Sequence, residues 1–137
     1  MNKPRNILSL DVGEKRIGLA SADTSIRIPV TRGVVVGGEG EIERILAVYS
    51  ELECNQVVIG LPRNSKGEET AQSVYVRSFA QRLSERGLEV FFQDESLTSV
   101  KAEEYLLQSR KPYTKGDIDT RAAAIILEDY LQSHYDW

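Results

Sequence analysis

The chain has 137 residues, of which 41% are hydrophobic, and a formal net charge of −4. This length and apolar content predict one domain, residues 1–137, built around one hydrophobic core. The negative net charge argues against a passive nucleic-acid binder, which usually carries a basic face, but it is compatible with an enzyme that holds divalent cations in an acidic cluster.

Few residue types are available for catalysis. Cys54 is the only cysteine and His134 the only histidine. One chain therefore cannot assemble a disulfide, a zinc cluster, a cysteine–histidine pair or a serine–histidine–aspartate triad. We interpret Cys54 as a small buried hydrophobe and His134 as a surface residue. No apolar run is long enough for a membrane span or a signal peptide, so we expect a cytoplasmic protein.

The hydrophobic pattern predicts strands first, then alternating helices and strands. Short apolar or β-branched runs indicate strands, whereas apolar residues three and four positions apart indicate helices. The predicted strands cover residues 7–12, 17–20, 27–36, 57–59 and 88–93. The predicted helices cover residues 39–54, 68–86, 98 or 99 to about 109, and 119–133, with Thr98 or Ser99 as the cap of the third.

Asp11 is a carboxylate near the end of the first predicted strand. Burying a charge in a sheet is costly unless the charge meets a cation or several hydrogen-bond donors. Metal ligation is one explanation of an acid at this point. The alternative is that Asp11 hydrogen-bonds the backbone of the turn at residues 13–16.

Two further acids occupy comparable places. Glu95 follows the last predicted strand, and Asp117 or Asp119 begins the closing helix. If the later strands run parallel to the first, their carboxyl ends flank the centre of the sheet, and the acids meet there. Mg²⁺ or Mn²⁺ suits such a set of oxygen ligands. Taken singly, Asp119 could instead be a helix cap and Glu95 a solvated strand end.

Basic residues lie in the loops and in the helix start expected at the same end of the sheet. Lysine and arginine there can contact the phosphates of a nucleic acid, although basic residues are also common in surface loops that bind nothing. These residues are Lys15, Arg16, Arg63, Lys66, Arg110, Lys111, Lys115 and Arg121.

Four motifs occur in order along nearly the whole chain: DVGEKRIGLA, GLPRNSKGEET, DESLTS and KGDIDTRAAAIIL. Together they resemble the YqgF family, also called RuvX, a branch of the ribonuclease H-like superfamily. The resemblance implies an α/β fold, with a five-stranded mixed sheet whose second strand is antiparallel to the others and with helices on both faces.

The resemblance also implies a nuclease that depends on Mg²⁺ or Mn²⁺. Asp11, Glu95 and Asp119 match the family's acids, and are therefore the expected catalytic residues and metal ligands; Asp117 has no match. The expected substrate-binding residues are Lys15, Arg16, Arg63, Asn64, Lys66 and Arg121. One position departs from the family pattern, because Ser96 stands where an arginine commonly follows the Asp-Glu pair.

Several functions remain open at this point. The resemblance favours 5′-end maturation of the small-subunit ribosomal RNA precursor, pre-16S rRNA, with cleavage of four-way DNA junctions as the alternative. A sugar-kinase or actin-like ATPase would need two such domains closing over a nucleotide. A nucleic-acid-binding module without catalysis is the remaining class. A homodimer is left open, since no alternating exposed face that would specify one is evident in the sequence.

Overall fold

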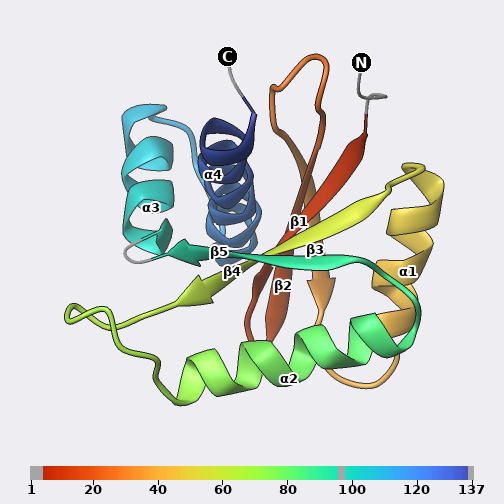
Figure 1. The fold of residues 1–137 in the computed structure, drawn as a ribbon. Coiled ribbons are helices and arrows are strands. Elements are labelled where there is room, and N and C mark those ends of the chain that lie inside the picture. Colours follow the sequence, from red (N-terminus) through yellow and green to blue (C-terminus); the bar gives the residue numbers. More distant parts are fainter. Residues whose placement is uncertain (1–4, 96–97, 136–137) are drawn as a thin grey trace.

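The computed structural model describes residues 5–95 and 98–135. Strands and helices follow one another in the predicted order (Figure 1). The strands are β1 (Asn6–Val12), β2 (Arg16–Asp23), β3 (Val30–Val36), β4 (Gln56–Pro62) and β5 (Val90–Glu95). The helices are α1 (Glu41–Glu51), α2 (Ala71–Glu85), α3 (Thr98–Gln108) and α4 (Lys115–His134).

The strands form a five-stranded sheet in the order β3-β2-β1-β4-β5. β1 pairs in parallel with β4, and β4 with β5, whereas β2 pairs antiparallel with both β1 and β3. This confirms the mixed sheet with an antiparallel second strand. It also brings the carboxyl ends of β1, β4 and β5 to one edge, where ligands of α/β sheets usually bind.

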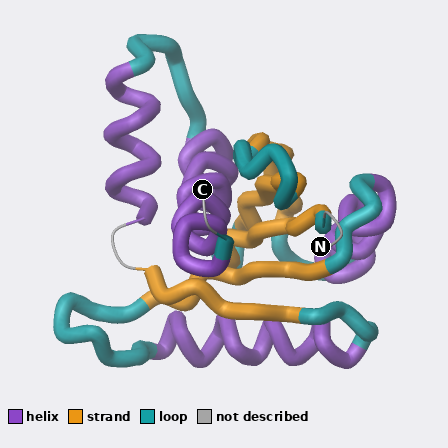
Figure 2. The backbone as a smooth tube through the Cα atoms, turned by 45° about the horizontal axis from the view of Figure 1, so that its top comes forward, coloured by secondary structure: helices purple, strands orange, loops and turns teal. Residues whose placement is uncertain are grey.

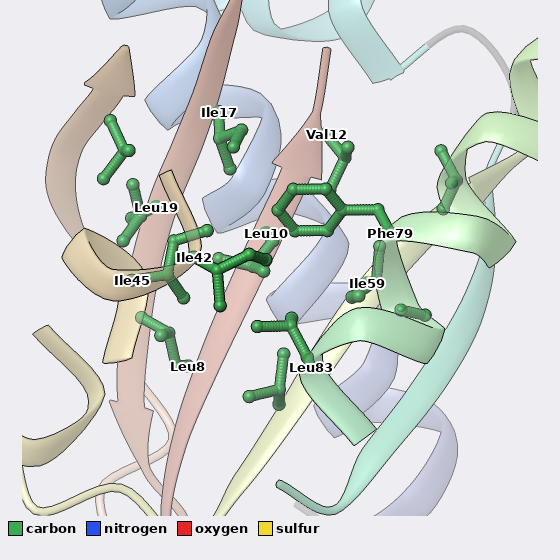
Figure 3. Packing of buried hydrophobic residues seen from close by; sticks show 14 of the residues in the cluster. Leu8, Leu10, Val12, Ile17, Leu19, Ile42, Ile45, Ile59, Phe79 and Leu83 are labelled. Atoms are coloured by element: carbon green, nitrogen blue, oxygen red, sulfur yellow. The ribbon is translucent and has the colours of Figure 1, made fainter. Parts of the chain in front are cut away.

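One face of the sheet carries the larger hydrophobic core, which α1 and α2 cover. Phe79 and Leu83 of α2 and Ile45 of α1 pack over Leu8 and Leu10 of β1 (Figure 3). All five side chains are at most 1% exposed. Because alternate residues of a strand point to opposite faces, the intervening residues of β1 must face the other side.

The other face is covered by α4, with α3 alongside it (Figures 1 and 2). Ile7 and Val58 pack against Leu127 and Leu131 of α4. Nearer its start, α4 meets β2 through small residues, Ala20 against Ala123 and Ala124. The closing helix can therefore approach the sheet closely, as its run of three alanines predicted.

Several predicted boundaries were wrong. α4 begins at Lys115 and not at Asp119, because Thr114 and Asp117 form a capping box. β3 begins at Val30 and not at residue 27, since Arg27 has a φ of 64°. The other elements differ by up to three residues at their ends. α3 begins at Thr98, but its expected cap at Thr98 or Ser99 rests on side chains outside the described part.

Some apolar surface stays exposed. β3 is an edge strand, and Val30, Val34 and Val36 are 45%, 39% and 65% exposed. Cys54 is buried, as predicted, and burial raises the pKa of its thiol to about 11. None of the helices in the described part of the chain is both long and apolar enough to cross a membrane.

Candidate active site

Asp11 lies on the sheet face that α4 covers. It follows Ile7 and Ser9 at two-residue steps along β1, and the Ser9 hydroxyl donates a hydrogen bond to the Ala123 carbonyl of α4, with an O–O distance of 2.7 Å. Alternation along the strand therefore directs the Asp11 carboxylate toward the same helix. Asp11 lies at the carboxyl end of β1, one residue before the strand ends.

Gly18 brings the start of α4 next to Asp11. Gly18 on β2 is the cross-strand partner of Asp11. A Cβ atom at Gly18 would collide with the carbonyl group of Asp119 and approach Thr120 N to 2.8 Å. Only glycine allows this approach of strand and helix. The Thr120 hydroxyl fixes the contact by donating to the Leu19 carbonyl, 2.6 Å away.

The surroundings of Asp11 disfavour its charged form. Burial raises the pKa of Asp11 from 3.8 to about 7, and the negative charge of Asp119 raises this pKa as well. Asp11 and Asp119 are therefore close enough to repel each other. A cation between them would remove both the repulsion and much of the desolvation cost.

Asp119 already has a cationic partner. Arg16 Nε donates to Asp119 Oδ2 across 2.6 Å, and the two side chains are 34% and 20% exposed. Arg16 is two residues from Gly18 on β2, so both point to the α4 face. No local sequence signal indicated this ion pair, because 103 positions separate its partners.

Glu95 ends β5 on the same face of the sheet. A Cβ atom built on Gly60 of β4 would lie 3.7 Å from Glu95 Cγ and 2.5 Å from Ile126 Cδ1 of α4. The Glu95 side chain therefore extends over β4 beneath α4. Ser96, the position that departs from the family pattern, lies outside the described residues.

The three matched acids have the chemistry of a magnesium site, but they are not assembled into one. Asp11, Glu95 and Asp119 supply only hard carboxylate oxygens, which Mg²⁺ and Mn²⁺ prefer. Within residues 5–95 and 98–135, no group of three or more His, Cys, Asp or Glu side chains is arranged to hold a metal ion. The donor set suits a divalent cation by its chemistry, while Asp119 is paired with Arg16 in this structure.

Asp117 has a structural role. Its carboxylate accepts a hydrogen bond from Thr114 N at 2.8 Å, and its own N–H donates to Thr114 Oγ1 at 3.1 Å. The cap of α4 is thus made by Thr114 and Asp117, which leaves the Asp119 side chain free to face β2. A threonine followed three residues later by an acid is the sequence signal for this cap.

The loop after β4 holds its own polar groups in place. The Asn64 side-chain oxygen accepts from Lys66 N at 3.0 Å and from Glu68 N at 2.9 Å. Arg63 Nε lies 3.2 Å from Asp94 Oδ1 of β5, and Arg63 also donates to the Gly67 carbonyl. Asn64 therefore shapes the loop, while the Lys66 side chain is exposed.

Arg121 lies on the side of α4 that faces α3. Its guanidinium carbon is 4.3 Å from the centre of the Tyr105 ring, a cation–π contact. Tyr105 is 52% exposed, and its position in the middle of α3 carried no functional signal in the sequence. Lys15, in the turn between β1 and β2, is exposed.

The comparisons with known proteins decide the family. A family model described as "RuvX: Holliday junction resolvase" matches residues 5–133. The chain belongs to the RuvX family. RuvX proteins are nucleases, so the chain is classed with hydrolases that act on phosphodiester bonds.

Relatives of this RuvX chain carry one common name, "Putative pre-16S rRNA nuclease". The protein from Chloroflexus aurantiacus (strain ATCC 29366 / DSM 635 / J-10-fl) is 42% identical, with 93% of this chain and 86% of the relative covered. The protein from Sulfurihydrogenibium sp. (strain YO3AOP1) is 37% identical, with 91% and 88% covered.

Solved resolvase structures share the fold of this RuvX chain. RuvC of T. thermophilus in complex with a Holliday junction substrate superposes with a TM-score of 0.56 at 17% identity, covering 96% of this chain and 97% of RuvC. Fowlpox virus resolvase, solved with Holliday junction DNA, gives 0.54 at 12% identity, with 96% and 99% covered.

Proposed function

We propose that this protein is a divalent-metal-dependent nuclease that hydrolyses phosphodiester bonds of precursor RNA, in the 5′-end maturation of pre-16S rRNA. The observation that supports it best is the placement of Asp11, Glu95 and Asp119 on one face of the sheet at the carboxyl ends of β1 and β5 and the start of α4. The name shared by relatives at 37% and 42% identity supports the substrate. The substrate implies a cytoplasmic enzyme.

Asp11, Glu95 and Asp119 would hold Mg²⁺ or Mn²⁺ through their carboxylate oxygens. When bound, such ions activate a water for attack on phosphorus and stabilise the leaving oxygen. Asp11 contributes a carboxylate whose charge is disfavoured without a cation. Glu95 enters from β5 and completes the set with Asp119, so each acid comes from a different element.

Basic residues around this edge would bind the RNA backbone. Arg63 is held by Asp94 and by the Gly67 carbonyl, so its guanidinium is oriented before substrate arrives. Lys15 and Lys66 are exposed on the two flanking loops and can reach phosphates along the strand. Asn64 contributes by fixing the shape of its loop.

Cleavage of four-way DNA junctions is the second candidate, favoured by the description of the family model and by the resolvase folds solved with junction DNA. Both reactions use the same acids and differ in the nucleic acid presented to them. A nucleic-acid-binding module without catalysis would keep the fold and the basic residues but show no metal-dependent cleavage.

The test presents the purified protein with pre-16S rRNA, an unstructured single-stranded RNA and a four-way DNA junction, each with Mg²⁺, with Mn²⁺ and with EDTA. We expect metal-dependent cleavage of the precursor RNA. Asp11→Asn should lower the rate about a thousandfold or more, since it removes a carboxylate that holds the ions. Asp23→Asn, at the opposite end of the sheet, is the matched control and should cleave normally.

Each outcome assigns a function. Cleavage of the DNA junction alone would replace the RNA proposal by the second candidate. Binding without metal-dependent cleavage of any substrate would identify the non-catalytic module. Equal activity of wild type and Asp11→Asn would contradict the assigned site.

A further inference from the structure

Arg16 occupies the place of a cation at the acidic site. Its Nε donates to Asp119 Oδ2 at 2.6 Å, while the charge of Asp119 acts on Asp11. Like charges brought together in a partly buried site need a positive neighbour. In this structure the positive neighbour of Asp119 is the guanidinium of Arg16.

The backbone around this ion pair leaves little room for adjustment. Asp119 is fixed by the contact of its carbonyl group with Gly18, and Gly18 is paired in register with Asp11. The turn before Arg16 is closed by a hydrogen bond from Gly13 N to the Arg16 carbonyl at 3.0 Å. The ion pair therefore opens by rotation of side chains and not by movement of the backbone, and the Arg16 side chain is the more exposed of the two, at 34% against 20%.

We propose that Arg16 is an internal counter-ion that a divalent cation displaces from Asp119, and that the displaced guanidinium then binds a phosphate of the substrate. This inference rests on the proposed metal-dependent function. A guanidinium and a divalent cation repel each other, and both require the oxygens of Asp119, so they compete for it. Arginine recognises phosphate through the same fork of donors that recognises a carboxylate.

The competition has a consequence that can be measured without catalysis. If Arg16 must leave before the metal binds, its removal makes the metal bind more tightly, because the lost ion pair no longer opposes binding. Removal of Arg16 should have the opposite effect on the substrate, which should bind more weakly. Once metal is bound, loss of the Arg16 guanidinium removes a phosphate contact.

The first measurement is calorimetric titration of Mg²⁺ into wild type, Arg16→Gln and Arg86→Gln. We expect Arg16→Gln to bind Mg²⁺ about fivefold more tightly or better. Arg86→Gln is the matched control, because Arg86 forms a similar ion pair, 2.6 Å from Glu43, between α2 and α1 on the other face of the sheet. Its Mg²⁺ affinity should equal that of wild type.

The second measurement needs no variant that removes the ion pair. The side-chain Nε–H signal of Arg16 can be assigned in ¹⁵N NMR spectra because it is missing from the spectrum of Arg16→Lys. In EDTA this Nε–H should be protected from hydrogen exchange with water, and it should lose that protection on addition of Mg²⁺. It therefore tests displacement even if Arg16→Gln does not fold.

The third measurement is binding of a single-stranded 2′-O-methyl RNA, with and without Mg²⁺. Arg16→Gln should weaken binding about fivefold or more with Mg²⁺ and leave it unchanged in EDTA. An equal loss under both conditions would show that Arg16 contacts phosphate without being displaced, and would overturn the inference.

The outcomes separate this inference from the proposed function. If Mg²⁺ binds wild type in an Asp11-dependent manner but Arg16→Gln has unchanged or weaker affinity, the displacement is wrong and the nuclease site stands. A persistent Arg16–Asp119 contact with Mg²⁺ bound would likewise overturn the displacement alone. If Mg²⁺ binds neither wild type nor Arg16→Gln, the metal site itself is wrong.

Discussion

Asp11 is a residue whose charge should govern how stability changes with pH. Its pKa of about 7 in the folded protein lies above the usual 3.8. Between about pH 4 and pH 7 the folded state therefore holds a proton that the unfolded chain has lost, and stability falls as the pH rises through this range. In EDTA at pH 8, Asp11→Asn should be about 2–4 kcal/mol more stable than wild type.

Urea unfolding of both proteins from pH 4 to pH 8 measures this effect. The difference should shrink as the pH falls below 7 and become small near pH 4, where Asp11 is protonated in the folded state and about half protonated in the unfolded chain. A difference that stays constant across this range would show that Asp11 is not held in a raised-pKa environment. Comparing the two proteins at each pH cancels the contributions of titrating groups that do not interact with Asp11.

Two acids of the same helix should behave differently when truncated. Asp117→Ala removes a capping-box partner of Thr114 and should cost about 1 kcal/mol of stability while metal-dependent cleavage is kept. Asp119→Ala removes a proposed metal ligand and should abolish cleavage. Thermal unfolding and single-turnover cleavage of both variants check this. Loss of cleavage in Asp117→Ala with cleavage intact in Asp119→Ala would reverse the assignment.

At this scale the sequence indicated candidate acids but not their partners. Asp11 and Glu95 were selected because strand ends can be located from local patterns, and Asp119 was selected by its motif match, since the start of its helix was misplaced. The Arg16–Asp119 ion pair joins residues 103 positions apart. Its existence depends on how closely α4 approaches β2, which no local pattern reports.

At the scale of elements, the close packing of α4 against β2 depends on Gly18. Gly18→Ala would place a Cβ against the Asp119 carbonyl group, and the backbone of a helix cannot yield as a flexible side chain can. We expect a loss of about 3 kcal/mol or more and a loss of Mg²⁺ binding, since Asp119 moves away from Asp11. Urea unfolding and calorimetry measure the two effects.

Gly116→Ala is the matched control within α4. A Cβ there would meet its nearest atom, Thr114 Oγ1, at an ordinary 3.5 Å. This substitution should raise stability by about 0.5–1 kcal/mol, because alanine favours a helix more than glycine does. If Gly18→Ala were equally tolerated, close strand–helix contact would not be what positions Asp119.

The order of elements could be read from the sequence because periods of two and of about 3.6 residues are local signals. Their ends could not always be read. The start of α4 was missed although Thr114 and Asp117 carried the capping signal, since Gly116 and the basic residues before it indicate a loop. The start of β3 was misplaced because residues 27–29 share the β-branched and proline-containing composition of an edge strand.

For the whole molecule, the net charge of −4 means that a nucleic acid would have to be bound by a local group of lysine and arginine side chains. Lys15, Arg63 and Lys66 lie on loops at the edge that holds the acids. In the Asp11→Asn background, Lys15→Ala and Lys66→Ala should each weaken RNA binding and lower the slope of log Kd against log salt by about 1. Fluorescence anisotropy at several salt concentrations measures both quantities.

Arg86→Ala, on the opposite face of the sheet, serves as the control and should leave the slope unchanged. Equal slopes for all variants would place the RNA elsewhere on the surface.

The sheet topology was predicted correctly because the motif match covers the whole chain. The exposed valines of β3 were not foreseen, since strand pairing decides which edge stays uncovered.

Asp11, Glu95 and Asp119 should share a divalent cation once Arg16 has moved aside, and the function proposed for this protein depends on that. A crystal structure of the wild-type protein with Mn²⁺, with the ions located by their anomalous scattering, tests it most directly. We predict Mn²⁺ bound to carboxylate oxygens of all three acids, with the Arg16 guanidinium withdrawn from Asp119. Mn²⁺ bound at other residues, with the Arg16–Asp119 ion pair unchanged, would contradict it.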